Sequence, residues 1–300
     1  MSAIALGATL YIPVLRPNLI EICQGNNPEL RSVAVCLEDS TREDELEIAR
    51  TRFSSFLVDL YRITPRIAIY VRPRDVAMLN WMIAQPGIEA VNGFILPKVE
   101  SSSIAHWLSV MVGTQHTFMP TIEGAEAFDR AALDQLCKQL LPFRDRVTAI
   151  RIGGNDILNI LGVRRSKFRT AYDGPLGAVI RDMAATFIPA GFSVAAPVFE
   201  HFNAPDVLRE EVERDIENGL LTKTAIHPRQ IGVIQSCYRP ASCDLLEAQA
   251  ILNAEARAVF GSQGSMCEPA THRRWAGNII ARAQTYGVDE SDIISPMRIA

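Results

Sequence analysis

Eight short apolar segments recur along this chain, and a stretch that can form a helix follows each of them. The segments cover residues 9–14, 32–37, 66–71, 91–96, 117–122, 148–152, 192–196 and 223–226. They are nearly continuous in Val, Ile, Leu and Ala, which is typical of strands buried on both faces in a parallel sheet. Between them, residues 42–62 and 125–141 space their apolar side chains at the helical period. Eight strand–helix pairs in about 240 residues predict an α/β fold of the (β/α)₈ TIM barrel type.

An open, doubly wound sheet is the alternative fold, because it also alternates strands with helices. That fold would need a glycine-rich phosphate turn after the first strand, whereas this chain has Leu-Arg-Pro-Asn at residues 15–18. The barrel is therefore favoured. Beyond the last segment the pattern becomes helical, with helices predicted over residues 244–260 and 269–286 and a linker between them. We expect a barrel domain over residues 1–240 and a C-terminal helical extension over 241–300 that covers the barrel or a neighbouring subunit.

Composition narrows the range of partners and compartments. The chain has 48% hydrophobic and 21% charged residues and a net charge of −4, which gives no reason to expect nucleic acid or an acidic membrane surface. No apolar run approaches the roughly 18 residues of a membrane span. The N-terminal segment is interpreted as a first strand rather than a signal peptide. The six cysteines show no Cys-X-X-Cys spacing, so we expect reduced thiols in a cytoplasmic protein.

Two acidic residues, Glu123 and Asp156, follow consecutive strand-like segments. A carboxylate next to a buried strand is costly unless a cation holds it. The carboxyl ends of parallel strands meet at one mouth of a barrel, so the two side chains are expected to converge there. Mg²⁺ takes one or two protein carboxylates and leaves its other positions to water and substrate. The pair therefore predicts a Mg²⁺ site, although each acid alone could cap a helix or pair with an arginine.

Ionisable residues also stand at the ends of most other predicted strands. They are Glu38, Asp39, Arg72, Lys98, Glu100, Glu200 and His227. Because the chemistry of such barrels takes place at this end of the strands, the sequence indicates an anion-binding, metal-dependent site. Two roles stay open at this point. Lys98 is either an active-site cation or the partner of a nearby glutamate, and His227 either contacts substrate or bonds a neighbouring loop.

The segment between the two acids contributes further candidates. Gly153 and Gly154 either present bare backbone amides to an anion or allow the chain to turn tightly. Asn155 is placed to align a water molecule, and Gly154 and Asn155 are included among the predicted substrate-binding residues. A basic patch in the loop that follows is interpreted as solvated or phosphate-facing. It consists of Arg164, Arg165, Lys167 and Arg169.

Seven short motifs at these strand ends resemble the HpcH/HpaI aldolase/citrate lyase family, in particular proteins similar to the citrate lyase beta subunit. In order, they are LYIPVLRP, VCLEDS, YVRP, LPKVES, PTIEGAEAF, GGNDILNILG and TAIHPRQI. The motifs occur in family order and extend over residues 8–240. Three features depart from the family pattern: Pro73 and Arg74 follow Arg72, the gap of 33 residues from Glu123 to Asp156 is long, and the loop before the seventh segment is unusual. They resemble a divergent branch associated with bacterial tellurite-resistance and stress gene clusters.

The resemblance implies a role for each matching position. Glu123 and Asp156 correspond to the two magnesium carboxylates. Arg72 corresponds to an arginine that grips a substrate carboxylate, and a planar guanidinium suits that task better than an ammonium group. Glu38 and Asp39 correspond to an acidic pair near the metal, which gives three predicted catalytic residues: Arg72, Asp39 and Glu38. The general base stays open between Asp39, Glu38 and a water on the metal.

The function implied is that of a Mg²⁺-dependent carbon–carbon lyase or aldolase. Its substrate would be a 3-hydroxy acid or its thioester, and it would release or use an oxaloacetate- or pyruvate-like fragment through a metal-stabilised enolate. Two alternatives are kept: a metal-dependent acyl thioester hydrolase, and a non-catalytic partner subunit of a biosynthetic stress-response assembly. The expected partners are a small carboxylate, free or as a coenzyme A thioester, and further copies of the chain in a trimer or larger homo-oligomer.

Overall fold

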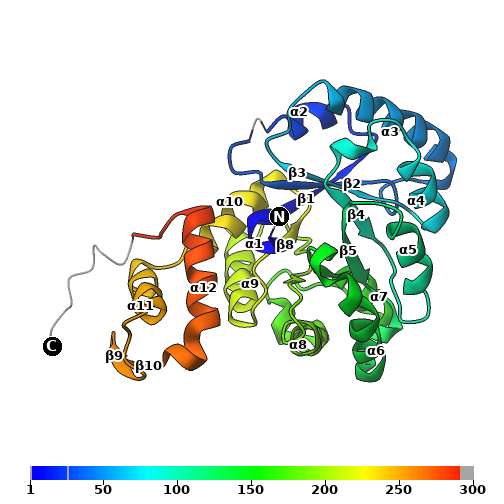
Figure 1. Cartoon of the computed structure of the whole chain (residues 1–300). Helices are drawn as coiled ribbons and strands as arrows, with labels where there is room; N and C mark the ends of the chain where they lie inside the picture. Colours follow the sequence, from blue (N-terminus) through cyan, green and yellow to red (C-terminus); the bar gives the residue numbers. More distant parts are fainter. Residues whose placement is uncertain (1, 26, 291–300) are drawn as a thin grey trace. The chain divides into compact units, whose positions relative to one another are not determined.

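Eight parallel strands form a barrel (Figure 1) in the computed structural model, which describes residues 2–25 and 27–290. The strand order is β7-β6-β5-β4-β3-β2-β1-β8. The strands are β1 (Ala8–Pro13), β2 (Ser32–Cys36), β3 (Ala68–Arg72), β4 (Gly93–Leu96), β5 (Thr117–Ile122), β6 (Ile150–Ile152), β7 (Val194–Ala195) and β8 (Lys223–Ala225). Ala196 joins the two edge strands, because its N–H donates to Thr222 O (2.8 Å) and its carbonyl accepts from Thr224 N (3.2 Å). The predicted TIM barrel is confirmed.

Helices surround the barrel in the positions that the strand–helix alternation predicts (Figure 1). They are α1 (Ala3–Leu6), α2 (Leu19–Cys23), α3 (Leu46–Tyr61), α4 (Val76–Ile83), α5 (Ile104–Met111), α6 (Arg130–Leu140), α7 (Gly154–Ile160), α8 (Pro175–Phe187), α9 (Pro205–Glu217) and α10 (Pro228–Cys237). The helix predicted over residues 125–141 is divided. Asp129 accepts hydrogen bonds from Ala131 N (2.8 Å) and Ala132 N (3.4 Å), and this cap starts α6 after a separate 3₁₀ turn.

The inside of the barrel is built from small residues at one level and charged residues at the next. Ala34, Ala68, Ala149 and Ala195 belong to one buried cluster around the ring of Tyr70. The Tyr70 hydroxyl lies 3.2 Å from Thr148 Oγ1, which satisfies it inside the protein. Successive inward positions on a strand are two residues apart. Arg72 on β3 and Arg151 on β6 therefore follow Tyr70 and Ala149 toward the C-terminal end of the barrel.

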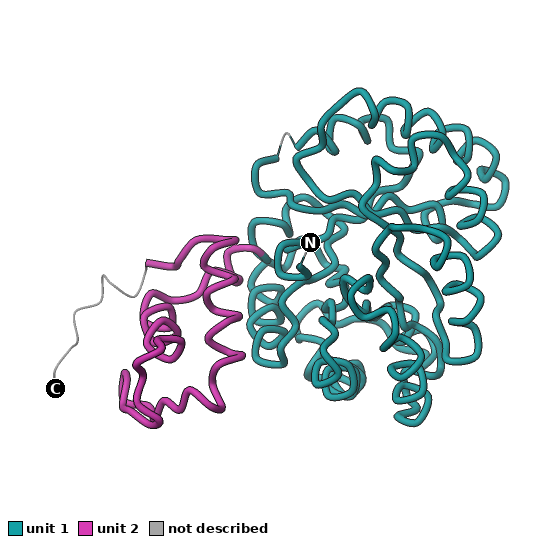
Figure 2. Tube along the Cα trace, viewed as in Figure 1, with its two compact units in different colours: residues 1–234 teal, residues 235–300 magenta. Residues whose placement is uncertain are grey.

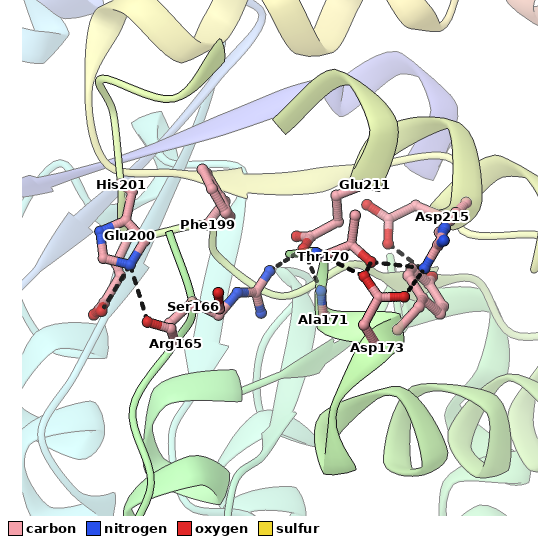
Figure 3. Close-up of polar contacts among 12 residues, drawn as sticks. Arg165, Ser166, Thr170, Ala171, Asp173, Phe199, Glu200, His201, Glu211 and Asp215 are labelled. Atoms are coloured by element: carbon pink, nitrogen blue, oxygen red, sulfur yellow. Dashed lines mark hydrogen bonds and ion pairs between the residues drawn. The ribbon is translucent and has the colours of Figure 1, made fainter. Parts of the chain in front are cut away.

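A buried network of charges links β8, α9 and the loop before α8. Figure 3 shows Arg165, Glu211 and Asp215, which belong to this network. Lys223 Nζ lies 2.9 Å from Glu211 Oε1 and 2.7 Å from Asp215 Oδ2, and all three side chains are fully buried. Arg165 pairs with the other oxygen of Glu211, and Tyr172 donates its hydroxyl hydrogen to Asp215 Oδ1 (2.8 Å). The basic loop was predicted to be solvated or phosphate-facing. For Arg165 this prediction is wrong, because its side chain is buried and paired with Glu211. Arg165 is buried because α9 supplies its carboxylate.

The described residues from 235 onward form a second compact unit, and those before 235 form the first (Figure 2). The second unit contains α11 (Ser242–Leu252), an antiparallel pair β9 (Phe260–Ser262) and β10 (Ser265–Cys267), and α12 (Pro269–Tyr286). The helix predicted over 269–286 is confirmed. The helix predicted over 244–260 ends early, because Asn253 has extended backbone angles. The supposed linker is a hairpin, whose turn uses Gly264 in the left-handed region (φ +78°).

The cysteines and the length of the apolar helices can be compared with the predictions made from composition. All six cysteines are free thiols, and Cys23, Cys36, Cys137 and Cys267 are buried. This agrees with the prediction that the cysteines are reduced. Within residues 2–25 and 27–290, none of the helices combines the length and the apolar character that crossing a membrane requires.

Candidate active site

A cavity of about 260 Å³ lies at the C-terminal ends of the barrel strands. The strand order brings together loops that are far apart in the sequence, as a barrel does at this end. Six of the seven predicted site residues line the cavity: Asp39, Arg72, Glu123, Gly154, Asn155 and Asp156. The seventh, Glu38, is buried and contacts Arg72. The residues that the sequence singles out therefore share one place, while their individual roles stay predictions.

Arg72, the last residue of β3, is the central cation of the cavity. Its Nη2 lies 2.9 Å from Glu38 Oε2, 3.0 Å from Glu123 Oε1 and 3.4 Å from Asp39 Oδ2. Burial lowers the pKa of Arg72, but Tyr11 and the two buried glutamates outweigh that effect and raise it, so the guanidinium stays charged. Nη2 of Arg72 thus contacts three carboxylates, whereas its buried Nε has no hydrogen-bond partner among the described residues.

Glu123 follows β5 and is held through both carboxylate oxygens, since Oε2 also accepts a hydrogen bond from Arg72 Nη2 (3.3 Å). Its Oε1 accepts hydrogen bonds from the backbone N–H of Lys98 (2.8 Å) and from Arg72 Nη2 (3.0 Å). A side chain at Gly153 would collide with Glu123 Cβ and Oε2, so only glycine leaves room for the Glu123 side chain in this position. Burial raises the pKa of Glu123 to about 7, an effect that Arg72 opposes and the charge of Asp156 reinforces. The environment of Glu123 is short of positive charge.

Asp156 approaches the same cavity from the first turn of α7. Burial, and then the charge of Asp39, raises its pKa. Glu123 and Asp156 are thus two carboxylates from consecutive strand–helix units. Burial and a neighbouring negative charge make each of them harder to ionise. The expected convergence of the two acids is present. Such a pair can hold a hard divalent cation through oxygen atoms.

Glu38 and Asp39 form an acidic pair after β2 that Lys98 also contacts. Lys98 Nζ lies 2.7 Å from Glu38 Oε1 and 3.7 Å from Asp39 Oδ1. Burial, together with a hydrogen bond to Asp39, raises the pKa of Glu38. Burial also opposes ionisation of Asp39, but hydrogen bonding to Glu38 and the charge of Arg72 outweigh it and lower its pKa. Asp39, whose pKa is lowered, lines the cavity, and the buried Glu38 contacts Arg72.

Lys98 is a cation with partners rather than a free one. Its ammonium group neutralises Glu38, which is one of the two readings that the sequence leaves open. Its backbone has a left-handed conformation (φ +49°), which is unusual for a residue with a side chain. This conformation accompanies the hydrogen bond from its N–H to Glu123. Lys98 thus contacts the acidic pair with its side chain and Glu123 with its main chain.

Gly154 and His227 have clear packing roles. A Cβ atom at Gly154 would lie 2.8 Å from Pro197 Cβ and 3.1 Å from Leu176 Cδ2, so only glycine allows α7 to start so close to these side chains. His227 is half-buried and stacks on Phe202 with ring centroids 4.6 Å apart. Its Nδ1 accepts a hydrogen bond from Arg229 N (3.2 Å). These contacts favour the structural reading of both residues.

Sequence reasoning missed the deeper wall of the cavity. Tyr11, Thr121, Arg151 and Thr224 line it from β1, β5, β6 and β8. These four residues lie within strands, whereas most of the predicted site residues follow a strand. Arg151 carried a signal, because an arginine in the middle of an apolar strand segment is unusual for a strand buried on both faces.

Comparison with known proteins agrees with the barrel fold and identifies the family of this chain. A family model described as carbon–carbon bond lyase of the TIM-barrel fold matches residues 1–288. Since the match covers nearly the whole chain, this protein belongs to that family of carbon–carbon bond lyases. The predicted relationship and the lyase class are confirmed at this level.

Individual relatives have low sequence identity to this chain. A (3S)-malyl-CoA thioesterase of Cereibacter sphaeroides (strain ATCC 17025 / ATH 2.4.3) is 26% identical over 246 residues, which is 79% of each chain. The structure of CitE from Mycobacterium tuberculosis with magnesium, acetoacetate and coenzyme A has a TM-score of 0.68 at 20% identity. The match covers 93% of this chain and 98% of that one. A citrate lyase from Burkholderia xenovorans LB400 has a TM-score of 0.71 at 16% identity, covering 96% and 94%.

Proposed function

We propose that this protein is a Mg²⁺-dependent carbon–carbon lyase. Its substrate is a 3-hydroxy acid, carried as a coenzyme A thioester, and cleavage releases an oxaloacetate- or pyruvate-like fragment. The observation that carries the proposal is the convergence of Glu123, Asp156 and Arg72 on one cavity at the C-terminal ends of the strands. Membership of the carbon–carbon bond lyase family supports the reaction class. The magnesium, acetoacetate and coenzyme A in the CitE structure support the choice of metal and thioester.

The residues of the cavity fit a divalent ion. Glu123 and Asp156 both have raised pKa values, although Arg72 lies beside Glu123, so a further positive charge would stabilise the ionised pair. In the part of the chain that the structure describes, His, Cys, Asp and Glu side chains form no cluster of three suited to a metal. Two carboxylates are enough for Mg²⁺, which usually keeps several waters. When bound, the ion would supply Lewis acidity beside a carbonyl group.

The chain's own residues would bind, orient and deprotonate the substrate. Arg72 offers its unpartnered Nε edge to a substrate carboxylate while Glu38 and Glu123 hold its Nη2 in place. Asp39 is ionised and lines the cavity, so it is the side chain placed to accept the proton of the 3-hydroxyl group. Its proton acceptance starts cleavage of the adjacent carbon–carbon bond.

Thioester hydrolysis is the second candidate function, because the curated relatives named above include (3S)-malyl-CoA thioesterases. The same cavity would then position water against the acyl carbonyl. The two reactions differ in their products, since cleavage of the carbon chain leaves the thioester intact and hydrolysis does not.

We therefore expect the protein to convert a 3-hydroxyacyl thioester, in the presence of Mg²⁺, into a shorter acyl thioester and a 2-oxo acid. The test uses three thioesters that would release glyoxylate, pyruvate or oxaloacetate, with mass spectrometry for the acyl thioester and a thiol reagent for free coenzyme A. Free coenzyme A formed together with the intact hydroxy acid would show hydrolysis instead. No turnover of the three would reject the lyase proposal for this substrate class.

We also propose that the chain forms a homo-oligomer of at least three copies, as its resemblance to citrate lyase-like proteins implies. The C-terminal unit exposes large apolar side chains, among them Leu246 (62% exposed) and Met266 (63% exposed), which a partner could cover. Light scattering of the purified chain is expected to give the mass of three or more copies. A stable monomer at micromolar concentrations would contradict this proposal.

A further inference from the structure

Arg151 is a buried cation to which no carboxylate is paired. Its side chain is 1% exposed and projects from β6 into the barrel. Nη2 donates a hydrogen bond to Thr224 Oγ1 (2.6 Å), and Nη1 lies 3.5 Å from the sulfur of Met119. The Nε atom is buried without a hydrogen-bond partner. Among the described residues, Arg151 forms no ion pair.

This situation is energetically unusual. A guanidinium group does not lose its proton in a protein, and a buried charge is normally paired or fully hydrogen-bonded. Arg165 and Lys223, which are similarly buried in the same unit, each pair with a buried carboxylate. Arg151 has only neutral contacts, including the ring of Tyr11, whose centroid is 5.3 Å from its Cζ. A cation–π contact offsets part of the burial penalty but does not replace an anion.

The position of Arg151 shows where an anion would come from. Arg151 lines the cavity together with Arg72 and Asp156. It precedes Gly153 and Asp156 on the same strand–helix unit, so it lies deeper in the barrel than the carboxylates at the mouth. Arg72 also lies over the Tyr11 ring, with its Cζ 6.0 Å from the centroid. Two guanidinium groups thus stand on the wall of one small cavity.

We propose that Arg151 binds a second anionic group of the substrate, so that the fragment released is a short dicarboxylate rather than a monocarboxylate. The inference rests on the proposed function, because Arg72 is taken to bind the first carboxylate. A cavity of about 260 Å³ is at the small end for ligand sites and suits an acid of a few carbon atoms. The second carboxylate supplies the counter-charge that the protein does not give to Arg151.

Two stable acids of equal length test this inference. Malate and 2-hydroxybutyrate differ only in whether the chain ends in a carboxylate or a methyl group. In calorimetry with Mg²⁺ present, the wild-type protein is expected to bind malate at least about tenfold more tightly. Arg151→Met should lower malate affinity about ten- to a hundredfold, the equivalent of one charge-assisted contact. The affinity for 2-hydroxybutyrate should change less than about twofold, because that acid does not reach Arg151 with a charge.

Three further variants separate the possible explanations. Arg151→Lys keeps the charge and should retain part of the preference for malate. Arg72→Lys should weaken both acids, because each has the carboxylate assigned to Arg72. Arg164→Met is the matched control, since Arg164 is exposed and does not line this cavity. It should bind both acids like the wild type.

Each other outcome is decisive. A wild-type protein that binds the two acids equally would overturn the role of Arg151. An Arg151→Met variant that loses both acids equally would show a structural residue instead. If Mg²⁺ binds but neither acid does, the inference fails while the metal site stands. If Mg²⁺ does not bind either, the proposed function itself fails. Thermal unfolding of every variant shows whether a loss of binding is a loss of fold.

Discussion

Glu123→Gln and Asp156→Asn are each expected to abolish measurable Mg²⁺ binding while the barrel remains folded. Each substitution keeps the size of the side chain and removes one of the two carboxylates proposed to hold the ion. A charge-assisted contact contributes roughly 1.5–3 kcal/mol, and each 1.4 kcal/mol is about tenfold in affinity. The loss should therefore reach at least about ten- to a hundredfold, and turnover should fall with it. Calorimetry with Mg²⁺ measures the first effect directly.

The fold should survive because burial opposes the charged form of both carboxylates. Burial raises the pKa of both, so a neutral amide is tolerated at each position. Asp145→Asn is a suitable control, since the side chain of Asp145 is 96% exposed and lies outside the cavity. Unchanged Mg²⁺ affinity in both site variants would place the metal elsewhere. Circular dichroism would reveal a variant that has lost metal only because it has unfolded.

Lys223→Met is expected to destabilise the protein by about 3–5 kcal/mol, the usual consequence of removing one partner from a buried ion pair. Lys223 is the shared partner of Glu211 and Asp215, and all three side chains are fully buried. Without it, the hydroxyl of Tyr172 is the one side-chain partner that Asp215 keeps among the described residues. Chemical denaturation measures the free energy of unfolding. Arg62→Met, which removes an exposed ion pair with Asp59, should cost less than about 1 kcal/mol.

The loss at Lys223 should also depend on pH. Burial raises the pKa of Asp215 to about 6 even though Lys223 opposes the shift, and removing the lysine would raise it further. A raised carboxyl pKa means that the folded state binds the proton more tightly than the unfolded state. Its contribution is present at low pH and is lost as the pH rises through the folded pKa. Lys223→Met should therefore be less harmful at pH 5 than at pH 8. An equal loss at both would indicate that the orphaned carboxylates do not ionise.

The sequence was informative wherever the relevant signal is local. Eight apolar segments identify the barrel because a strand that is buried on both faces needs a nearly continuous run of apolar residues. Arg72, Glu123 and Asp156 meet because the closed barrel brings all strand ends to one side. The early end of α11 was missed, because the backbone at Asn253 leaves the helix where apolar spacing would allow it to continue. Helical periodicity alone does not mark such an end.

Partners from distant segments were beyond the reach of sequence patterns. Arg165 reads as part of a basic surface loop until α9 places Glu211 beside it, 46 residues later. Arg151 reads as one more residue of a strand until the barrel closes and its side chain meets Thr224 from β8, 73 residues away. In both cases the charge is visible in the sequence, while the burial and the partner depend on tertiary packing.

The contacts of Arg72 have a consequence for how variants of this site combine. One nitrogen, Nη2, lies within 3.4 Å of carboxylate oxygens from Glu38, Asp39 and Glu123. Removing any one acid leaves the guanidinium free to shift toward the other two, so no single substitution reports on its own residue alone. Effects within this set will not be additive. The three acids and the arginine therefore act as one unit, and the effect of a substitution at one position depends on the residues present at the other three.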